Sequence, residues 1–438
     1  MEAKFCAVCA WRGNCQIKFA RLDGIASQCL HFTRDVELER RAAVRESADV
    51  VIAGAGIGGL SLGLFLAEKG HRIIILERGE ELVPVQKPEV LQPEALEILE
   101  RLGALDGLLA MGPARCECYH FYQPGGRPLV NVRCCPPAWR PVHGLITLPH
   151  WTRQALLGRL QAYPRARLFW GADLTDLTRA GGAVTGVRAR VKGRDWSFSA
   201  PVVVGADGAA SRVRAALKVA GEVHRYPDAF VSVLVDRSAG IGSDVHYYVG
   251  RRSFLGVFPI SSDALCLLLS VDAEQAHPFT SLLGPSLAER VAAMAPAVAE
   301  AVRTSADWEH ATLLPCVCAC VARWVADGAA LMGDSAHACH PYMGLGSALA
   351  MEDARVLAQV LEGCFQRGDF SAEALTAYEA ARRPVVERLQ RLAEQRVMLW
   401  NTANPFLAWA RSGMFRAVAR HPRLLSKEFI ANAVGVAQ

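Results

Sequence analysis

The 438-residue sequence lacks several features that would assign a protein to a class at once. It has no long run of charges of one sign, and its 48 basic and 43 acidic residues give a net charge of only +5. Such mixed charge does not indicate nucleic acid as a partner. No internal repeat or low-complexity tract is visible, which speaks against repeat architectures.

The N-terminus lacks the continuous apolar core of a secretory signal, because charged side chains interrupt it from Glu2 to Arg21. One charge-free run, Val50 to Ala67, has the 18 residues of a candidate membrane span. The glycines in its middle favour another interpretation, given below. We therefore expect a cytoplasmic protein. With 52% hydrophobic residues, the chain can bury a large core in two or three structural units.

The chain contains 14 cysteines, and in a reducing compartment their spacing is read for metal before disulfides. Four stand close together near the N-terminus: Cys6, Cys9, Cys15 and Cys29. Four thiolates can ligate zinc tetrahedrally or hold an iron–sulfur cluster, and the alternative is unliganded thiols on a tail. Zinc would make this segment a structural module or a docking site for a partner, whereas a cluster would relay electrons.

A strand, a glycine turn, a helix and a second strand are predicted within thirty residues. The apolar run Asp49–Ala53 predicts a buried strand, Ile57–Lys69 a helix that stops at Gly70, and Arg72–Glu77 a β-branched strand. This order is that of a βαβ unit.

The turn carries the pattern G-x-G-x-x-G at Gly54, Gly56 and Gly59, with Gly58 inside it. In this context the first glycine allows a tight turn, the second lets a pyrophosphate approach the backbone, and the third lets helix and strand pack closely. Glu77, 18 residues beyond Gly59, stands where an acid binds the adenosine ribose, and Arg78 follows it. The segment predicts a dinucleotide site. An ordinary glycine turn with a surface glutamate is the alternative.

Two later segments resemble motifs of one flavoprotein family. Val204–Arg214 reads V-G-A-D-G-A-A-S-R-V-R, and Gly333–Gly346 reads G-D-S-A-H-A-C-H-P-Y-M-G-L-G, followed by A-M-E-D-A at Ala350–Ala354. Together with the fingerprint they resemble the FAD-dependent single-component aromatic hydroxylases and ubiquinone-biosynthesis hydroxylases over roughly residues 48–360.

The resemblance implies an α/β fold. It has a Rossmann-like, three-layer FAD-binding domain, an inserted, mostly antiparallel substrate sheet and a C-terminal helical region. The predicted divisions are residues 1–45, 46–221, 222–320, 321–365 and 366–438. Within them we expect helices at Glu94–Leu109, Ser286–Val302 and Ser347–Leu361.

The resemblance also implies roles for individual residues. Asp334 would bind the ribityl hydroxyls of FAD, and Pro341 with the turn Gly344, Leu345 and Gly346 would pass along the flavin. The helix beginning near Ser347 would direct its positive N-terminus at the flavin. The other residues implied to lie at the cofactor are Gly333, Asp207, Gly208, Arg153 and Gln92. For Arg153, a surface position on a helix is the alternative.

The activity implied is hydroxylation of an aromatic, quinone-like or polyketide-like small molecule, with NAD(P)H and O2 as co-substrates and a flavin C4a-hydroperoxide as the oxygen carrier. Phe258 and Pro259 are candidate pocket walls. His340 and Tyr342, which flank Pro341, are the candidate catalytic residues, although His340 would equally serve as a structural hydrogen-bonding residue.

Departures from the family pattern support a second interpretation. Leu345 and Ala348 stand where relatives commonly have glutamine and asparagine. In this interpretation the chain is an FAD-dependent double-bond reductase or quinone oxidoreductase, and it receives electrons through an N-terminal iron–sulfur cluster. A non-catalytic flavin-binding partner protein is the third interpretation. The apolar and basic segment Leu399–Val436 is consistent with peripheral contact with a membrane, or with a packed helical layer. Cys316, Cys318 and Cys320 alternate along one strand and are expected to be buried.

Overall fold

The computed structural model describes residues 44–420, apart from 135–142, 239, 275 and 277–282. The four N-terminal cysteines proposed as metal ligands, at positions 6, 9, 15 and 29, lie outside these residues. Within the described chain, no helix combines the length and the hydropathy needed to cross a bilayer. The charge-free run from Val50 to Ala67 forms a strand, the glycine turn and most of a helix.

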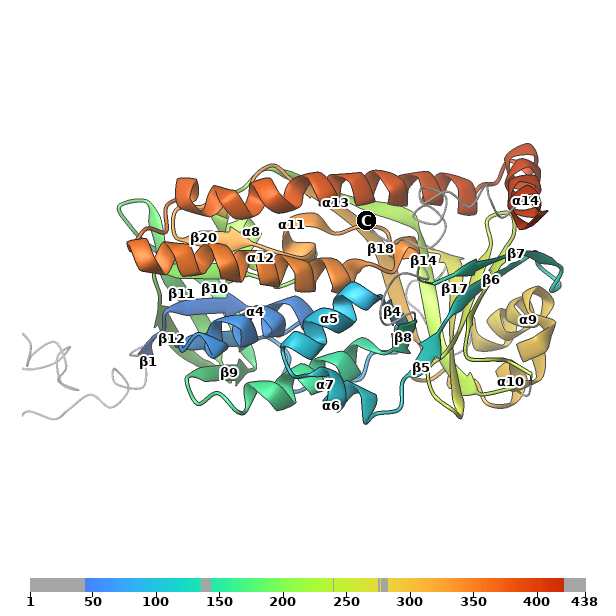
Figure 1. The fold of residues 1–438 in the computed structure, drawn as a ribbon, viewed down its shortest axis with the longest axis horizontal. Helices are drawn as coiled ribbons and strands as arrows, with labels where there is room; N and C mark the ends of the chain where they lie inside the picture. The colour runs from blue at the N-terminus through green and yellow to red at the C-terminus, as the bar shows by residue number, and fades with distance from the viewer. Residues whose placement is uncertain (1–43, 135–142, 239, 275, 277–282, 421–438) are drawn as a thin grey trace, which may run out of the picture.

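A six-stranded sheet forms the centre of the larger part of the molecule (Figure 1). Its strands lie in the order β19 (Val325–Ala326), β20 (Ala329–Leu331), β13 (Val202–Gly205), β2 (Val50–Ala53), β3 (Ile73–Glu77) and β9 (Ala166–Trp170). All neighbours are parallel except β19 and β20. β2 and β13 are buried along their whole length, as the valine-rich sequences of parallel strands require.

Two layers cover this sheet. On one face lies α4 (Ile57–Glu68), which packs against α7 (Pro149–Leu160) and α12 (Gly346–Arg367), with α13 (Ala372–Trp400) beyond. On the other lies a four-stranded sheet in the order β1 (Val44–Ser47), β12 (Arg194–Ser199), β11 (Ala183–Val191) and β10 (Ala172–Ala180), whose β10 and β11 contact the central strands. The predicted three-layer α/β architecture is confirmed.

A seven-stranded sheet forms the other end of the molecule. Its order is β18 (Thr312–Val321), β14 (Gly221–Asp236), β17 (Ala264–Asp272), β16 (Phe254–Pro259), β15 (Val245–Val249), β6 (Cys118–Tyr122) and β7 (Pro128–Arg133). It is antiparallel except where β15 pairs with β6. Two of its strands thus come from residues 118–133, which the sequence grouped with the nucleotide-binding part.

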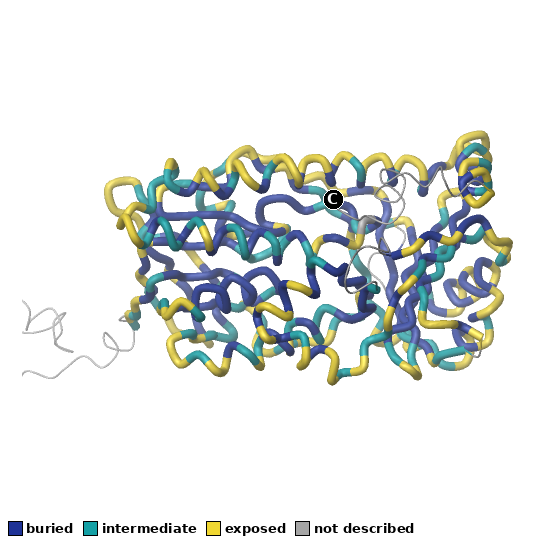
Figure 2. The backbone as a smooth tube through the Cα atoms, viewed as in Figure 1, coloured by how far each residue is buried: buried dark blue, intermediate teal, exposed yellow. Residues whose placement is uncertain are grey.

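The two faces of this sheet carry different side chains, because successive residues of a strand point to opposite sides. Val231, Leu255 and Leu267 belong to a cluster with helices α9 (Gly284–Met294) and α10 (Ala299–Thr304). Their neighbours Phe230 and Phe254 belong to a second cluster, on the face toward the rest of the molecule. In Figure 2 the backbone of the interior strands is coloured as buried, and exposed turns lie along the outer side of α13.

Three details differ from the sequence predictions. The helix expected at Glu94–Leu109 is two helices, α5 (Pro93–Arg101) and α6 (Leu105–Leu109), because Gly103 between them has φ +66°. The helix expected at Ser286–Val302 is likewise divided, by a short 3₁₀ turn at Pro296–Val298. Of the alternating cysteines on β18 only Cys316 is buried, since Cys318 is half-buried and Cys320 is exposed.

Candidate active site

The fingerprint glycines lie where β2 turns into α4, and their surroundings differ. A Cβ on Gly54, whose φ is +106°, would lie 2.3 Å from the carbonyl oxygen of Ala206. One on Gly59 would lie 2.1 Å from the carbonyl oxygen of Gly54. A Cβ on Gly56 would meet no atom of the described residues within 4 Å. Two glycines therefore let the protein pack on itself, whereas Gly56 leaves open space at a helix N-terminus.

Glu77 and Arg153 both hold the fingerprint loop. The Glu77 carboxylate accepts hydrogen bonds from the backbone N–H groups of Ala55 (2.9 Å) and Gly79 (3.0 Å). Arg153 donates from Nε to the Ala55 carbonyl at 3.0 Å, and its guanidinium lies 3.8 Å from Glu77. Burial lowers the pKa of Arg153, and Glu77 opposes that shift. The alternative that Arg153 is a surface side chain is therefore wrong.

A first cavity runs beside this loop at the carboxyl ends of β2, β3 and β13. Among its lining residues are seven predicted from the sequence: Gly54, Gly56, Glu77, Arg78, Arg153, Asp207 and Gly208. Asp207 uses one carboxylate oxygen to accept from the N–H groups of Arg212 and Val213 at the start of α8 (Arg212–Leu217). Its other oxygen is buried and has no partner among the described residues, so it is available to a ligand.

The second motif joins β20 to α12. Asp334, which is exposed, begins the short helix α11 (Asp334–His337). A buried ionic network holds the motif from behind. Asp353 accepts from the backbone N–H of Gly333 at 2.9 Å, and it contacts His337 Nε2 at 2.6 Å and Arg382 Nε at 2.7 Å. Gly333, a predicted cofactor residue, thereby has its backbone fixed.

A second cavity lies between this motif and the seven-stranded sheet. Its predicted lining residues are Gln92, Phe258, Asp334, His340, Pro341, Tyr342, Gly344, Leu345, Gly346 and Ser347. Its other walls are mainly apolar, with Phe230, Tyr247, Phe254, Leu268 and Trp400. Pro259, Gly58 and Gly333 line neither cavity. A Cβ on Gly58 would lie 2.9 Å from the Ala350 side chain, so this glycine serves the packing of α4 on α12.

Glu89 and Tyr119 are among the polar residues of this cavity that were not predicted. Glu89, on β4 (Glu89–Leu91), is 6% exposed and accepts hydrogen bonds from Ser347 and from Thr152 (2.9 Å). Burial raises its pKa, against the effect of both hydroxyl groups. Tyr119, on β6, accepts a 2.8 Å hydrogen bond from the Gln92 amide. The sequence signal for Glu89 was a single acid between Pro88 and the apolar pair that ends β4.

Arg396 brings a buried cation to the second cavity and lies on the last turns of α13. Only 4% of it is exposed, and it donates to the Tyr342 carbonyl at 3.1 Å. Its guanidinium lies 5.4 Å from the Trp400 ring centroid. Burial lowers the pKa of Arg396 to about 10. The cavity thus combines aromatic walls with a buried positive charge.

His340 and Tyr342 stand beside a buried carboxylate. Nδ1 of His340 accepts the backbone N–H of Tyr342 at 3.3 Å, and Nε2 lies 3.4 Å from Asp228. Within the described chain, neither Asp228 oxygen has a hydrogen-bond partner, nor does the Tyr342 hydroxyl. Asp228 lies in an irregular step of β14, where its pairing with β18 shifts between Arg225 and Ala229. Such irregularities redirect side chains near functional sites.

Cys316 completes this group, since ligand atoms of Asp228, Cys316 and His340 lie within 4.8 Å of one another. The three residue types suit zinc. The hydrogen bond at Nδ1 argues against that use, because a neutral imidazole that accepts at Nδ1 carries its proton on Nε2. The protonated Nε2 then lies 3.4 Å from the Asp228 carboxylate, and within the described chain Nε2, like the Asp228 oxygens, has no hydrogen-bond partner.

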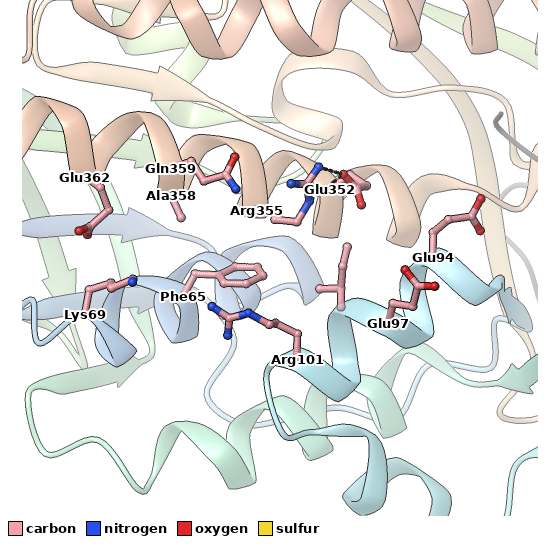
Figure 3. A pocket seen from close by; sticks show the side chains of 11 residues that line it. Phe65, Lys69, Glu94, Glu97, Arg101, Glu352, Arg355, Ala358, Gln359 and Glu362 are labelled. Carbon is pink, nitrogen blue, oxygen red and sulfur yellow. Dashed lines mark hydrogen bonds and ion pairs between the residues drawn. The ribbon is translucent and has the colours of Figure 1, made fainter. Parts of the chain in front are cut away.

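A further groove lies between α4, α5 and α12 and contains none of the predicted site residues (Figure 3). Acidic and basic side chains from α5 and α12 line it, among them Glu94, Glu97, Arg101, Glu352 and Arg355. Glu352 and Arg355 are paired at 2.8 Å. Burial, with Glu97 and Glu352 nearby, raises the pKa of Glu94 to about 7.

This shift predicts a pH-dependent stability. The folded-state pKa of Glu94 lies above the unfolded value of about 4.3, so its ionisation lowers stability as the pH rises from about 4 to 7. Glu94→Gln should raise the free energy of unfolding at pH 8 by about 1 kcal/mol, discounted for solvent screening, and leave it unchanged near pH 4. Urea unfolding at both pH values tests this. The control is Glu97→Gln, at an exposed position. Equal gains in the free energy of unfolding of Glu94→Gln at both pH values would contradict the prediction.

Comparison with known proteins identifies what the chain is similar to. The model of the FAD binding domain family matches residues 47–393. The 6-methylpretetramide 4-monooxygenase of Streptomyces rimosus is 30% identical over 360 residues, covering 80% of this chain and 84% of the relative. The kynurenine 3-monooxygenase of Salinispora arenicola is 27% identical over 80% of this chain and 79% of its own.

Solved structures share the fold. PqsL of Pseudomonas aeruginosa, in complex with 2-aminobenzoylacetate, superimposes with a TM-score of 0.74 at 24% identity, over 84% of this chain and all of its own. The p-nitrophenol 4-monooxygenase PnpA of Pseudomonas putida gives 0.77 at 19% identity, over 89% of this chain and 98% of its own. At these identities the likeness concerns the fold alone.

Proposed function

Since the chain belongs to the FAD binding domain family and is an FAD-dependent monooxygenase, we propose that it hydroxylates a phenolic, polycyclic aromatic small molecule of the polyketide type with NAD(P)H and O2. The observation that carries the proposal is the aromatic cavity that opens onto the second flavin motif and contains a buried arginine. Its walls suit a planar ring system, and Arg396 suits an acidic hydroxyl or carbonyl oxygen on that ring system.

The residues of both cavities fit FAD. Gly56 offers open space at the N-terminus of α4, and one buried oxygen of Asp207 lacks a partner among the described residues. When bound, FAD supplies a flavin that NAD(P)H reduces and that activates O2 for transfer of one oxygen atom to the substrate. We assign the pyrophosphate to the loop at Gly54–Gly59 and the adenosine ribose to Glu77, with Arg78 and Arg153 beside them.

The second motif would bind the flavin end. Asp334 is proposed to accept hydrogen bonds from the ribityl chain, and the backbone of Pro341 and Gly344–Ser347 to line the flavin. The N-terminus of α12 would stabilise negative charge at the flavin. Gln92, fixed by Tyr119, would contact the ring. Leu345 is 4% exposed, so the departure from the family glutamine adds apolar surface that keeps water away.

Proton removal from the substrate hydroxyl is assigned to His340. With its protonated Nε2 directed at Asp228, the imidazole keeps a lone pair on Nδ1, whose 3.3 Å bond to the Tyr342 N–H is long. Hydrogen bonds of catalytic groups are often long before substrate binds. Asp228 is then a positioning residue, because it fixes the tautomer of His340 and stabilises its charged form. Tyr342 forms the adjacent wall.

Asp228→Asn tests this pair. It should reduce kcat about tenfold to thirtyfold, since the amide no longer favours the productive tautomer or the imidazolium, while FAD affinity is unchanged. A substrate analogue with a more acidic hydroxyl should recover most of the loss, because less help is needed to remove its proton. Cys316→Ser, a change in the same buried group, is the matched control. Equal losses for acidic and ordinary substrates would contradict the assignment.

Labelled oxygen gives the test of the proposed function. The FAD-loaded protein, supplied with NAD(P)H and ¹⁸O2, should transfer one labelled atom into a phenolic polycyclic substrate. Product without label, formed by gain or loss of hydrogen alone, would instead support the oxidoreductase interpretation. NAD(P)H oxidation with no product for any phenolic compound would overturn the proposed substrate class.

Two finer proposals concern the ends of the chain. The cysteines at positions 6, 9, 15 and 29 are proposed to hold zinc or an iron–sulfur cluster, which metal and sulfide analysis of protein purified without oxygen would distinguish. The C-terminal region is proposed to make peripheral contact with a membrane.

A further inference from the structure

Exposed apolar side chains gather at the end of α13 and along α14 (Pro405–Arg420). Ten large hydrophobic residues are exposed in the described chain, and six of them lie between residues 398 and 414. These six are Met398 (68% exposed), Leu399 (38%), Phe406 (67%), Leu407 (43%), Trp409 (65%) and Met414 (42%), here called the α14 patch. Clusters of this kind mark binding surfaces, whereas single exposed side chains do not.

The α14 patch is held in place by a buried arginine. Arg411, 3% exposed, donates to the carbonyl groups of Leu399 (2.9 Å) and Trp400 (3.2 Å) on α13. It also donates to the carbonyl groups of Val249 (3.2 Å), the last residue of β15, and of Gly250 (3.0 Å), which follows it. The exposure of the patch is therefore a property of the packed structure and not of a loose helix end.

Helix α14 carries apolar side chains both on its buried face and on its exposed face. Ala408, Phe415 and Val418 are buried against the sheet. Phe406 and Trp409, three residues apart, share a helix face, and their rings stack at 5.9 Å between centroids. Met414 is exposed as well. A surface helix of a globular protein normally turns polar residues outward, so this outer face indicates an apolar partner.

The charges around the α14 patch favour a partner with an anionic surface. From residue 395 to 420 the chain contains no Asp or Glu, while Arg416 and Arg420 follow the patch. The exposed Arg251 and Arg252 join the same surface, because Arg251 donates to the Ala403 carbonyl at 3.0 Å and Arg252 donates its backbone N–H to Thr402 at 3.1 Å. Aromatic and aliphatic side chains with a basic rim match the interface of an anionic bilayer.

A second copy of the chain fits this surface less well. In a twofold dimer the same patch meets itself, so the arginines of the two rims would face one another, and juxtaposed like charges are unfavourable. We propose that the α14 patch docks the protein on an anionic membrane surface. Arg396 and Trp400 line the second cavity from the same end of α13 that exposes Met398 and Leu399, so docking brings the substrate cavity close to the bilayer.

Flotation of the full-length, FAD-loaded protein with vesicles tests the proposal. Vesicles of phosphatidylcholine with about 30% phosphatidylglycerol should carry the protein upward, and pure phosphatidylcholine should carry roughly tenfold less. The double change Phe406→Ser and Trp409→Ser should lower binding to the anionic vesicles at least about tenfold. The matched control is Val223→Ser with Val385→Ser, two exposed valines outside the patch, which should bind like the wild type.

Three outcomes would overturn the proposal. The first is no binding to anionic vesicles, and the second is equal binding by the double variant. The third is a dimer in sedimentation that the double variant abolishes without any vesicle binding, which would assign the patch to a second copy. Binding is read without substrate, so a failed hydroxylation assay does not affect the result.

Discussion

Gly56→Ala should reduce the affinity for FAD at least about 100-fold, or roughly 2.7 kcal/mol, without destabilising the apoprotein. No atom of the described residues lies within 4 Å of the added Cβ, and the backbone at Gly56 (φ −70°, ψ 176°) is accessible to any residue. The methyl group instead occupies the space through which a pyrophosphate reaches the N–H groups of α4. Fluorescence titration of the apoprotein with FAD measures the affinity, and thermal unfolding measures the stability.

A matched control distinguishes a lost contact with the cofactor from the general effect of replacing a glycine by alanine. A Cβ added to Gly158, on α7, would likewise meet no neighbouring atom of the described chain within 4 Å, and Gly158→Ala should leave FAD affinity unchanged. Gly54→Ala is different, since its Cβ would clash with the Ala206 carbonyl and should lower stability as well. Full FAD affinity in Gly56→Ala would contradict the placement of the pyrophosphate at this loop.

Asp353→Ala should lower the free energy of unfolding by about 3–5 kcal/mol. The change removes the partner of the buried Arg382 and of His337, and it leaves the Gly333 N–H without an acceptor. Urea unfolding measures the loss. Glu352→Ala, at the preceding position and in a half-exposed ion pair with Arg355, is the control and should cost less than about 1 kcal/mol.

The difference in the free energy of unfolding between the wild type and Asp353→Ala should depend on pH in a definite direction. Burial acts to raise the pKa of Asp353, but His337 and Arg382 hold it below its ordinary value. A carboxyl group with a lowered folded-state pKa stabilises the protein above the unfolded value of about 3.9 and loses that effect as the pH falls through the folded value. The gap between wild type and Asp353→Ala should therefore narrow below about pH 3.9. A constant gap across this range, from neutral pH down to strongly acidic pH, would contradict the role of the ion pairs.

The features that were predicted from the sequence are those set by residues close together along the chain. The βαβ unit, the fingerprint and the second motif each occupy a short stretch whose glycines and buried strands determine the local backbone, so cavity residues such as Glu77 and Asp207 could be named in advance. Arg153 was also named, although its contact with Ala55 spans 98 positions, because a family motif carried it.

Residues brought to the site by long-range pairing were not predicted. Glu89 becomes a cavity residue only when α12 places Ser347 against it, 258 positions away. Asp228 faces His340 because β14 is irregular where it pairs with β18, and no local pattern marks that irregularity. Arg396 and Trp400 read as ordinary members of a long helix. Their position at its cavity end depends on how α13 crosses the molecule.

The pairing of β15 with β6 has a consequence for synthesis of the chain. Strand β6 ends at Tyr122, but its parallel neighbour β15 begins at Val245, so the ribosome must add more than a hundred residues before the two can meet. Helix α12, which packs against α4, is synthesised later still. A nascent chain that stops before α13 therefore cannot form the complete second cavity, because Arg396 and Trp400 line it. We expect FAD to be acquired only after release of the finished polypeptide, which makes bound flavin a convenient sign that folding has reached its end.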